Sequence, residues 1–176
     1  KEVDDIEEIL KYYKNPFNYT GGKYKLLPQI LKYFPTHINV FVDLFTGGGE
    51  VGLNTNANLT VCNDKCKQLM NIYKNLNGDF TNEVKEVINK WKLNKWSKNE
   101  FLKLRQYYND NLKNTANREQ AVTLYCLLTH AFNNQIAFNS KYEYNTPSGA
   151  SRQYFSKSLE NKLNEYIKVI QNKNIN

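Results

Sequence analysis

Three glycines and an aspartate form the pattern in this chain with the clearest chemical meaning. Gly47, Gly49 and Gly52 have the spacing G-x-G-x-x-G and follow the apolar, β-branched run 40–45. Asp64 ends the next such run, twelve residues after the last glycine. A glycine turn after a strand lets the backbone approach a ligand, and a carboxylate at the tip of the following strand can accept hydrogen bonds from both hydroxyls of a ribose. The pattern therefore predicts a site for a nucleotide-like ligand.

A second carboxylate narrows the class of ligand. The glycine spacing alone fits NAD as well as S-adenosylmethionine. Asp43 ends the first strand, four residues before Gly47. A carboxylate there disfavours a pyrophosphate and suits the cationic amino group and sulfonium of S-adenosylmethionine. The alternative for Asp43 is a helix cap or a solvated strand end.

A second glycine turn lies upstream, in the segment Asn18-Tyr19-Thr20-Gly21-Gly22-Lys23. The ring of Tyr19 can pack on a cofactor, and the ammonium of Lys23 can meet a carboxylate. A solvated lysine after a turn is the alternative.

The elements that must position these residues follow from hydrophobic periodicity and turn signals. We expect a short acidic helix near residues 3–10, a helix that ends near Pro35, a buried strand over 40–45, a strand over 59–62 and a helix over 69–76. A strand, glycine turn, helix, strand and helix in this order are typical of a parallel α/β sheet.

From about residue 77 the pattern becomes helical. Thr81 is expected to cap one helix, and Ser97 with Glu100 is expected to form a capping box ahead of a second. The run 119–132 predicts a third helix, the most apolar of the chain. A polar loop and hairpin over 133–149 and a final helix over 159–170 complete the prediction.

Composition limits the classes of protein. The chain has 176 residues, 40% of them apolar, and its longest apolar runs fall short of the ~18 residues of a membrane span. We therefore expect no membrane segment and no secretory leader. The 24 Lys and Arg outnumber the 17 Asp and Glu, and the excess lies after the acidic first ten residues. Residues 11–176 can therefore bind along a polyanion such as a nucleic acid. Lysine and asparagine abundance from an AT-rich genome is the alternative explanation.

The cysteines and histidines do not predict a metal or nucleophilic site. Cys62, Cys66 and Cys126 are an odd number, which favours reduced thiols and a cytoplasmic protein. Neither His37 nor His130 lies in a paired-ligand pattern, so buried thiols are favoured over zinc.

Four segments in order resemble the Dam-type DNA adenine-N6 methyltransferases. They are residues 16–23 (PFNYTGGK), residues 41–49 (FVDLFTGGG), Asn63-Asp64, and the region from Phe132-Asn133-Asn134 to Asn145-Thr146-Pro147-Ser148-Gly149. The resemblance implies a Rossmann-like, S-adenosylmethionine-dependent methyltransferase fold with an inserted helical target-recognition domain.

The resemblance also implies roles for residues and boundaries for domains. Tyr19, Lys23 and Asp64 would contact S-adenosylmethionine, and the pocket would be shaped by Asp43, Phe45, Gly47 and Gly49. Residues 1–75 would form the N-terminal part of the cofactor-binding domain. Residues 76–152 would form the target-recognition domain, with a hairpin that enters the major groove of double-stranded DNA, and residues 153–176 a helix that returns to the first domain.

The asparagine-rich loop carries the candidate contacts to DNA. Relatives that recognise GATC-like sites have an arginine where this chain has Ala137, so a GATC target is not expected. The candidate contacts are Asn133, Gln135 and Asn139 (the last two suited to base edges), Lys141 and Arg152 for phosphates, and Pro147 against a base. A solvated hairpin of turn-forming residues is the alternative.

One motif of the family is missing. Its catalytic tetrapeptide, an Asp or Asn, two prolines and an aromatic, accepts hydrogen bonds from the target N6. Here Pro16, Pro28, Pro35 and Pro147 are never adjacent. Only two parallel strands are predicted, and two strands make a poor independent domain. We therefore expect the front portion of a longer enzyme, inactive without its C-terminal portion.

The leading hypothesis is a site-specific DNA adenine-N6 methyltransferase that acts on an adenine flipped out of the duplex, of the kind found in restriction-modification pairs. The first alternative is a non-catalytic DNA-binding module of the same fold. The second is an NAD-binding oxidoreductase.

Overall fold

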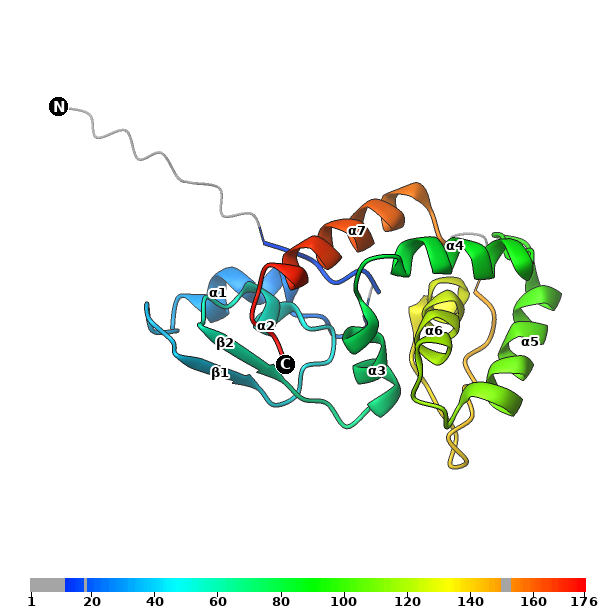
Figure 1. The fold of residues 1–176 in the computed structure, drawn as a ribbon, viewed down its shortest axis with the longest axis horizontal. Coiled ribbons are helices and arrows are strands. Elements are labelled where there is room, and N and C mark those ends of the chain that lie inside the picture. Colours follow the sequence, from blue (N-terminus) through cyan, green and yellow to red (C-terminus); the bar gives the residue numbers. More distant parts are fainter. Residues whose placement is uncertain (1–11, 18, 150–152) are drawn as a thin grey trace.

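The computed structural model describes residues 12–17, 19–149 and 153–176. The predicted acidic helix near residues 3–10 lies outside these ranges. Two strands lie at one end of the molecule and helices α4, α5 and α6 gather at the other, while the long helix α7 runs back from the helices toward the strands (Figure 1). The mixed helix and strand prediction is confirmed.

The strands form a parallel pair, as the sequence predicts. Strand β1 (Val40–Asp43) pairs with β2 (Leu59–Cys62) in a register that sets Val40 opposite Leu59 and Asp43 opposite Cys62. Both predicted acidic strand ends therefore lie at the same edge of the sheet. The helices in the part of the chain that holds the two strands are η1 (Tyr24–Leu26), α1 (Leu27–Leu31), α2 (Glu50–Asn54) and α3 (Lys67–Asn75).

A third segment, near the end of the chain, pairs in parallel with the other side of β2. The Thr60 N–H donates to the Asn174 carbonyl at 2.9 Å, the Cys62 N–H to the Asn176 carbonyl at 2.7 Å, and the Asn176 N–H to the Thr60 carbonyl at 2.9 Å. Ile175 forms a parallel bridge with Thr60. The sequence analysis missed this pairing because a few polar residues around one isoleucine carry no strand pattern.

The prediction that the first strand is buried is wrong, because one of its faces is exposed and Phe41 and Asp43 on the other face are only half-buried. The side chains of Val40 and Val42 are each 54% exposed. Successive side chains of a strand alternate between the two faces of a sheet, and in the described part of the chain the packing helices cover only the other face. An apolar run therefore did not imply burial on both sides here.

The helical part is built around α6 (Arg118–His130), in which every residue from Gln120 to His130 is buried. Helices α4 (Phe80–Lys90) and α5 (Lys98–Tyr107) contact it. The remaining elements are a π-helical turn η2 (Tyr108–Leu112), a 3-10 turn η3 (Phe132–Asn134) and α7 (Lys157–Gln171). The prediction that the third helix is the most apolar is confirmed.

The predicted cap at Thr81 is wrong, and the predicted capping box at Ser97 has the right N-cap residue but not its hydrogen bond. Asp79 stands at the N-cap of α4, and the hydroxyl of Thr81 donates instead to the Asn164 Oδ1 at 2.6 Å. Ser97 does occupy the N-cap of α5, but its hydroxyl bonds the backbone of Asn94 rather than the helix. Both side chains found partners outside the first turn of the helix.

The predicted hairpin over 133–149 consists of two antiparallel bridges, Ala131 with Ser148 and Phe138 with Tyr144. The ring of Tyr144 is buried against Phe138 and Tyr108. This loop is thus held by one isolated bridge at its base, by a second bridge nearer its tip and by the buried ring of Tyr144.

Candidate functional site

The glycine turn after β1 has the tight geometry that its spacing predicts. Gly47 and Gly49 adopt left-handed conformations, with φ of +48° and +74°. A Cβ on Gly49 would stand 2.7 Å from the Tyr166 hydroxyl and 3.0 Å from the Tyr73 hydroxyl. The Tyr73 hydroxyl donates to the Gly47 carbonyl at 2.8 Å. Helices α3 and α7 therefore hold the turn through Tyr73 and Tyr166, whose hydroxyls leave no room for a side chain on Gly49.

Both predicted aspartates lie at this turn. The Asp64 Oδ2 accepts from the Gly47 N–H, and its Oδ1 accepts from the Cys66 N–H, each at 2.9 Å. The Asp43 Oδ2 accepts from the Gly52 N–H at 3.1 Å. Burial raises the pKa of Asp43, while the bond from Gly52 opposes that rise. The ends of the two strands thus bring two carboxylates to one glycine turn.

The upstream turn packs against the first. A Cβ on Gly47 would meet the Tyr19 ring at 3.3 Å, so the ring lies directly over the turn. Burial raises the pKa of the Tyr19 hydroxyl, and the charge of Asp64 raises it further. The Lys23 ammonium donates to the Gly21 carbonyl at 2.8 Å in an exposed position. Two turns that are separate in sequence therefore form one surface.

A cavity of about 340 Å³ opens between the two turns. It brings together six of the seven residues predicted to surround a cofactor: Tyr19, Lys23, Asp43, Phe45, Gly47 and Asp64. Gly49 does not line it and instead faces a separate cavity beside Tyr73 and Tyr166. The ring of Phe45 is 83% exposed.

The sequence analysis missed one charged residue of this cavity. Glu50 also lines it and is only 2% exposed. The lining therefore holds three carboxylates, of Asp43, Glu50 and Asp64, against the single ammonium of Lys23. An acid immediately after the glycine turn was the available signal.

The asparagine-rich loop adjoins the same turn. A cavity of about 250 Å³ is lined by Tyr19 and Thr20 on one side and by residues 134–137 on the other. Asn133 and Asn134 both have left-handed backbones, with φ of +51° and +52°. Gln135 and Ala137 are exposed. One predicted base-reading position, Gln135, therefore lies beside the upstream turn, and the predicted DNA contact Asn133 directly precedes the lining residues in sequence.

The other predicted DNA contacts are less uniform. The Asn139 Oδ1 accepts from the N–H groups of Lys141 and Glu143, and its amide donates to the Glu143 carboxylate at 2.8 Å. Its side chain is thus used in the turn of the hairpin. Lys141 and Pro147 are exposed, and Arg152 lies outside the described residues.

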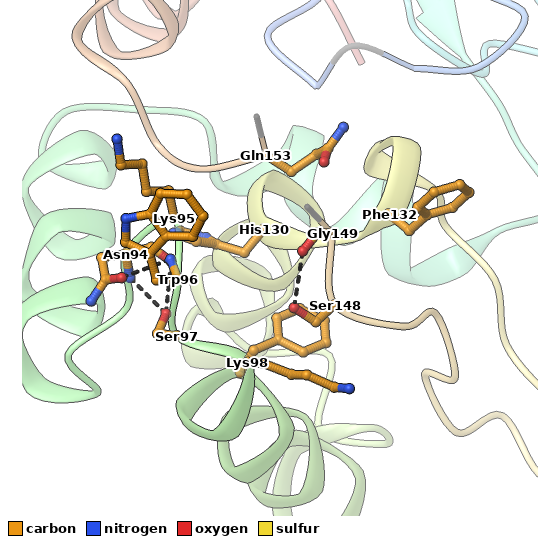
Figure 2. A pocket seen from close by; sticks show the side chains of 11 residues that line it. Asn94, Lys95, Trp96, Ser97, Lys98, His130, Phe132, Ser148, Gly149 and Gln153 are labelled. Carbon is orange, nitrogen blue, oxygen red and sulfur yellow. Dashed lines mark hydrogen bonds between the residues drawn. The ribbon is translucent and has the colours of Figure 1, made fainter. Parts of the chain in front are cut away.

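A larger cavity of about 550 Å³ lies in the helical part, between the loop that precedes α5 and the end of the hairpin (Figure 2). Trp96, Lys95 and Lys98 stand on one side and Ser148 and Gly149 on the other. It holds none of the residues predicted as site residues.

Two residues of this cavity differ in burial. The exposed ring of Phe132 also contributes to the wall, and sequence analysis gave it no role of its own. Burial lowers the pKa of His130, whose Nδ1 lies 2.8 Å from the Cys126 carbonyl.

Within the described ranges, groups of three or more His, Cys, Asp and Glu side chains that could hold a metal ion are not found. All three cysteines are free, and burial raises the thiol pKa of Cys62 and Cys66. Helices long and apolar enough to cross a membrane are also not found in this part of the chain.

Comparison with known proteins decides the family. Residues 19–176 match the family model of the D12 class N6 adenine-specific DNA methyltransferases. The chain belongs to this family. The resemblance to Dam-type enzymes is thereby confirmed, and the α/β structure is that of a methyltransferase family.

Individual relatives agree with this assignment. The chain is 36% identical over 170 residues to the modification methylase StsI of Streptococcus sanguinis and 38% identical over 168 residues to the type II methyltransferase M.FokI of Planomicrobium okeanokoites. It is 30% identical over 179 residues to the modification methylase LlaI of Lactococcus lactis subsp. lactis.

The coverage of these comparisons is unequal. The matches take in 94%, 93% and 94% of this chain but 25%, 25% and 27% of the three relatives. The D12-family chain thus spans about a quarter of the length of the curated relatives it matches.

Proposed function

We propose that this D12-family protein transfers a methyl group from S-adenosylmethionine to N6 of an adenine in double-stranded DNA. The observation that carries the proposal is the cavity between the two turns, whose lining holds three carboxylates and one ammonium. The ammonium and sulfonium of S-adenosylmethionine outweigh its single carboxylate, so an acidic cavity attracts it. The same cavity repels the pyrophosphate of NAD, which argues against an oxidoreductase.

Each lining residue has a role that its chemistry supports. Asp64 would accept hydrogen bonds from the ribose hydroxyls, as it now accepts the Gly47 N–H. Asp43 would face the cationic end, and Lys23 the carboxylate. The rings of Tyr19 and Phe45 would pack on the flat part of the cofactor. Bound S-adenosylmethionine supplies a methyl group on a positively charged sulfur.

We assign DNA recognition to the helical part, residues 76–152, and to its hairpin. The loop at 134–137 shares a cavity with Tyr19 and Thr20. This short path supports a flipped adenine moving from the DNA at the loop toward the cofactor cavity beside Tyr19. Gln135 would read a base edge, Asn133 would contact the DNA, Lys141 would hold a phosphate, and Pro147 would pack against a base. Because the side chain of Ala137 cannot donate hydrogen bonds to a guanine, we propose a target other than GATC.

Two of the predicted contacts need separate treatment. The amide of Asn139 is used within the hairpin, so we assign it to shaping that turn rather than to reading bases. Arg152 remains a prediction, since it lies outside the described residues.

The target adenine must leave the base stack, because its N6 is otherwise out of reach of a methyl donor. The protein's part in transfer is then to position donor and acceptor in line. Because adjacent prolines do not occur in the sequence, we assign no residue of this chain to accept hydrogen bonds from N6.

Calorimetry and a methylation assay test the proposal with the full-length protein. We expect S-adenosylmethionine to bind and NAD not to bind, and we expect tritium from labelled cofactor to appear in N6-methyladenine of duplex DNA. Binding of NAD alone would contradict the cofactor assignment. DNA binding without incorporation would favour the non-catalytic module, which the separated prolines make the second candidate.

A further inference from the structure

We propose that Glu50 and Asn15 are positioning residues for the cofactor site. Their hydrogen bonds hold the turn that carries Tyr19 and Lys23 against the glycine turn. The proposal rests on the proposed function of the cavity between these turns, and it assigns a role to two residues that the sequence motifs do not single out.

Glu50 holds both ends of the upstream turn with one carboxylate. It is the first residue of α2, directly after the glycine turn. Its Oε1 accepts from the Asn15 Nδ2 at 2.7 Å, and its Oε2 accepts from the Tyr24 N–H at 2.9 Å. Asn15 and Tyr24 stand on either side of Tyr19 and Lys23. The carboxylate therefore fixes where the segment enters and leaves the site.

Asn15 passes this constraint on to Tyr19. Its side chain is 1% exposed, and its Oδ1 accepts from the N–H of Phe17 at 3.0 Å and from the N–H of Tyr19 at 3.2 Å. Its Nδ2 meanwhile donates to Glu50. A carboxamide is the group that can accept and donate in this way, because an aspartate at this position would set one carboxylate against another.

Two glycines make the contact possible through lack of a side chain. A Cβ on Gly22 would stand 2.7 Å from the Glu50 Oε2. A Cβ on Gly48 would stand 2.9 Å from the Asn15 Nδ2 and 3.3 Å from the Cβ of Tyr19. Neither glycine has a left-handed backbone, so their role is steric. Gly22, directly before Lys23, and Gly48, in the middle of 47–49, therefore leave room for the Asn15 and Glu50 pair.

Burial gives the pair its effect. A buried carboxylate is costly unless its oxygens are hydrogen-bonded, and these donors come from the upstream turn. Opening that turn would leave Glu50 unsatisfied. The Tyr19 ring is therefore held in place before a cofactor arrives, which lowers the entropy lost on binding.

A swap of the two side-chain types tests the pair in the full-length protein. In E50Q an NH2 group would face either the Asn15 Nδ2 or the Tyr24 N–H, and in N15D two carboxylates would meet. We expect each single change to weaken S-adenosylmethionine binding by about 10- to 100-fold, the effect of losing one hydrogen bond to a charged group. The double variant N15D/E50Q restores a donor against an acceptor, with the total charge unchanged, and we expect it to regain most of the affinity.

Calorimetry measures binding, hydrogen exchange of the Phe17 and Tyr19 amides reports the turn directly, and circular dichroism reports folding. The matched controls are E86Q and N89D, on exposed positions of α4, which should change none of these. Recovery by the double variant supports the pair, including when a single variant fails to fold.

Two outcomes would overturn the proposal. In the first, the single variants fold, bind S-adenosylmethionine as the unaltered protein does and keep both amides protected from exchange. In the second, the double variant binds no more tightly than the weaker of the two single variants. Absence of binding by the unaltered protein would instead contradict the proposed function. Amide exchange would then still decide whether the pair holds the turn.

Discussion

The two sides of the proposed active site are held in different ways. On the cofactor side, the turns are fixed by side chains from other elements, namely the half-buried Tyr73 and the buried Tyr166 and Glu50, and by glycines without room for a Cβ. On the DNA side, the loop 133–149 is held by partners within itself and the adjoining helices, and it leaves Gln135 and Lys141 exposed. The contrast suits the proposed function, in which one side binds a cofactor and the other side contacts DNA. Substitutions on the cofactor side should therefore affect both stability and cofactor binding. Substitutions in the loop should affect DNA binding alone.

The largest effect is expected from Gly49→Ala on the cofactor side. The new Cβ would collide with the hydroxyls of Tyr73 and Tyr166 in a left-handed backbone, so we expect a loss of about 2 kcal/mol or more of unfolding free energy. Urea denaturation measures it. Gly21→Ala is the matched control, because Gly21 has φ of +83° but open space around it, and it should lose only about 1 kcal/mol. Equal losses in the two variants would show that the tyrosines do not confine the turn.

The next effect is expected from Asp64→Asn. An amide has one oxygen in place of two equivalent ones and carries no charge. The variant would therefore accept fewer hydrogen bonds from the ribose hydroxyls and would attract the cationic groups of the cofactor less. We expect S-adenosylmethionine binding to weaken by about 10- to 100-fold in calorimetry. Asp79→Asn, on an exposed position, should leave binding unchanged. An unaltered affinity in Asp64→Asn would remove this residue from the cofactor site.

The pH dependence of cofactor binding should report Asp43. Burial raises its pKa above 3.8, so its carboxylate gains a proton at a higher pH than an ordinary aspartate does. The proposed cofactor, S-adenosylmethionine, is cationic, so its binding should weaken as the pH falls through that raised pKa. By the same shift, ionising Asp43 opposes folding as the pH rises through this range. Asp43→Asn should bind weakly and with a flatter profile in calorimetry across mildly acidic pH. An identical profile in the variant would assign the dependence to another group.

The smallest effect on the fold is expected from Gln135→Ala in the loop. The side chain is exposed, while the backbone carbonyl that receives Tyr144 and Thr146 remains. We expect unchanged unfolding and unchanged cofactor binding, with discrimination at one base pair reduced by about 1 to 3 kcal/mol. Competition binding against a panel of DNA duplexes measures it. A variant that weakened all duplexes equally would indicate a phosphate contact instead of base reading.

Local patterns predicted much of the fold. The strand at 59–62 has the predicted bounds, and the helices at 67–75, 118–130 and 157–171 lie close to the predicted ranges. These elements follow from periodicity and turn residues, which act over a few positions. The cap at Thr81 and the capping bond of Ser97 were wrong because each hydroxyl had a competing partner, and for Thr81 that partner lies on α7, 83 residues away.

The same division runs through the proposed site. The amino-acid sequence by itself determined the glycine turns, the acids at the ends of the strands and the family, because residue type and spacing suffice for these. Tertiary structure alone decided that Asn15 meets Glu50, that one face of β1 stays uncovered among the described residues and that the amide of Asn139 is used within its own hairpin. Which buried donor faces which acceptor depends on how elements pack, and no local pattern records that.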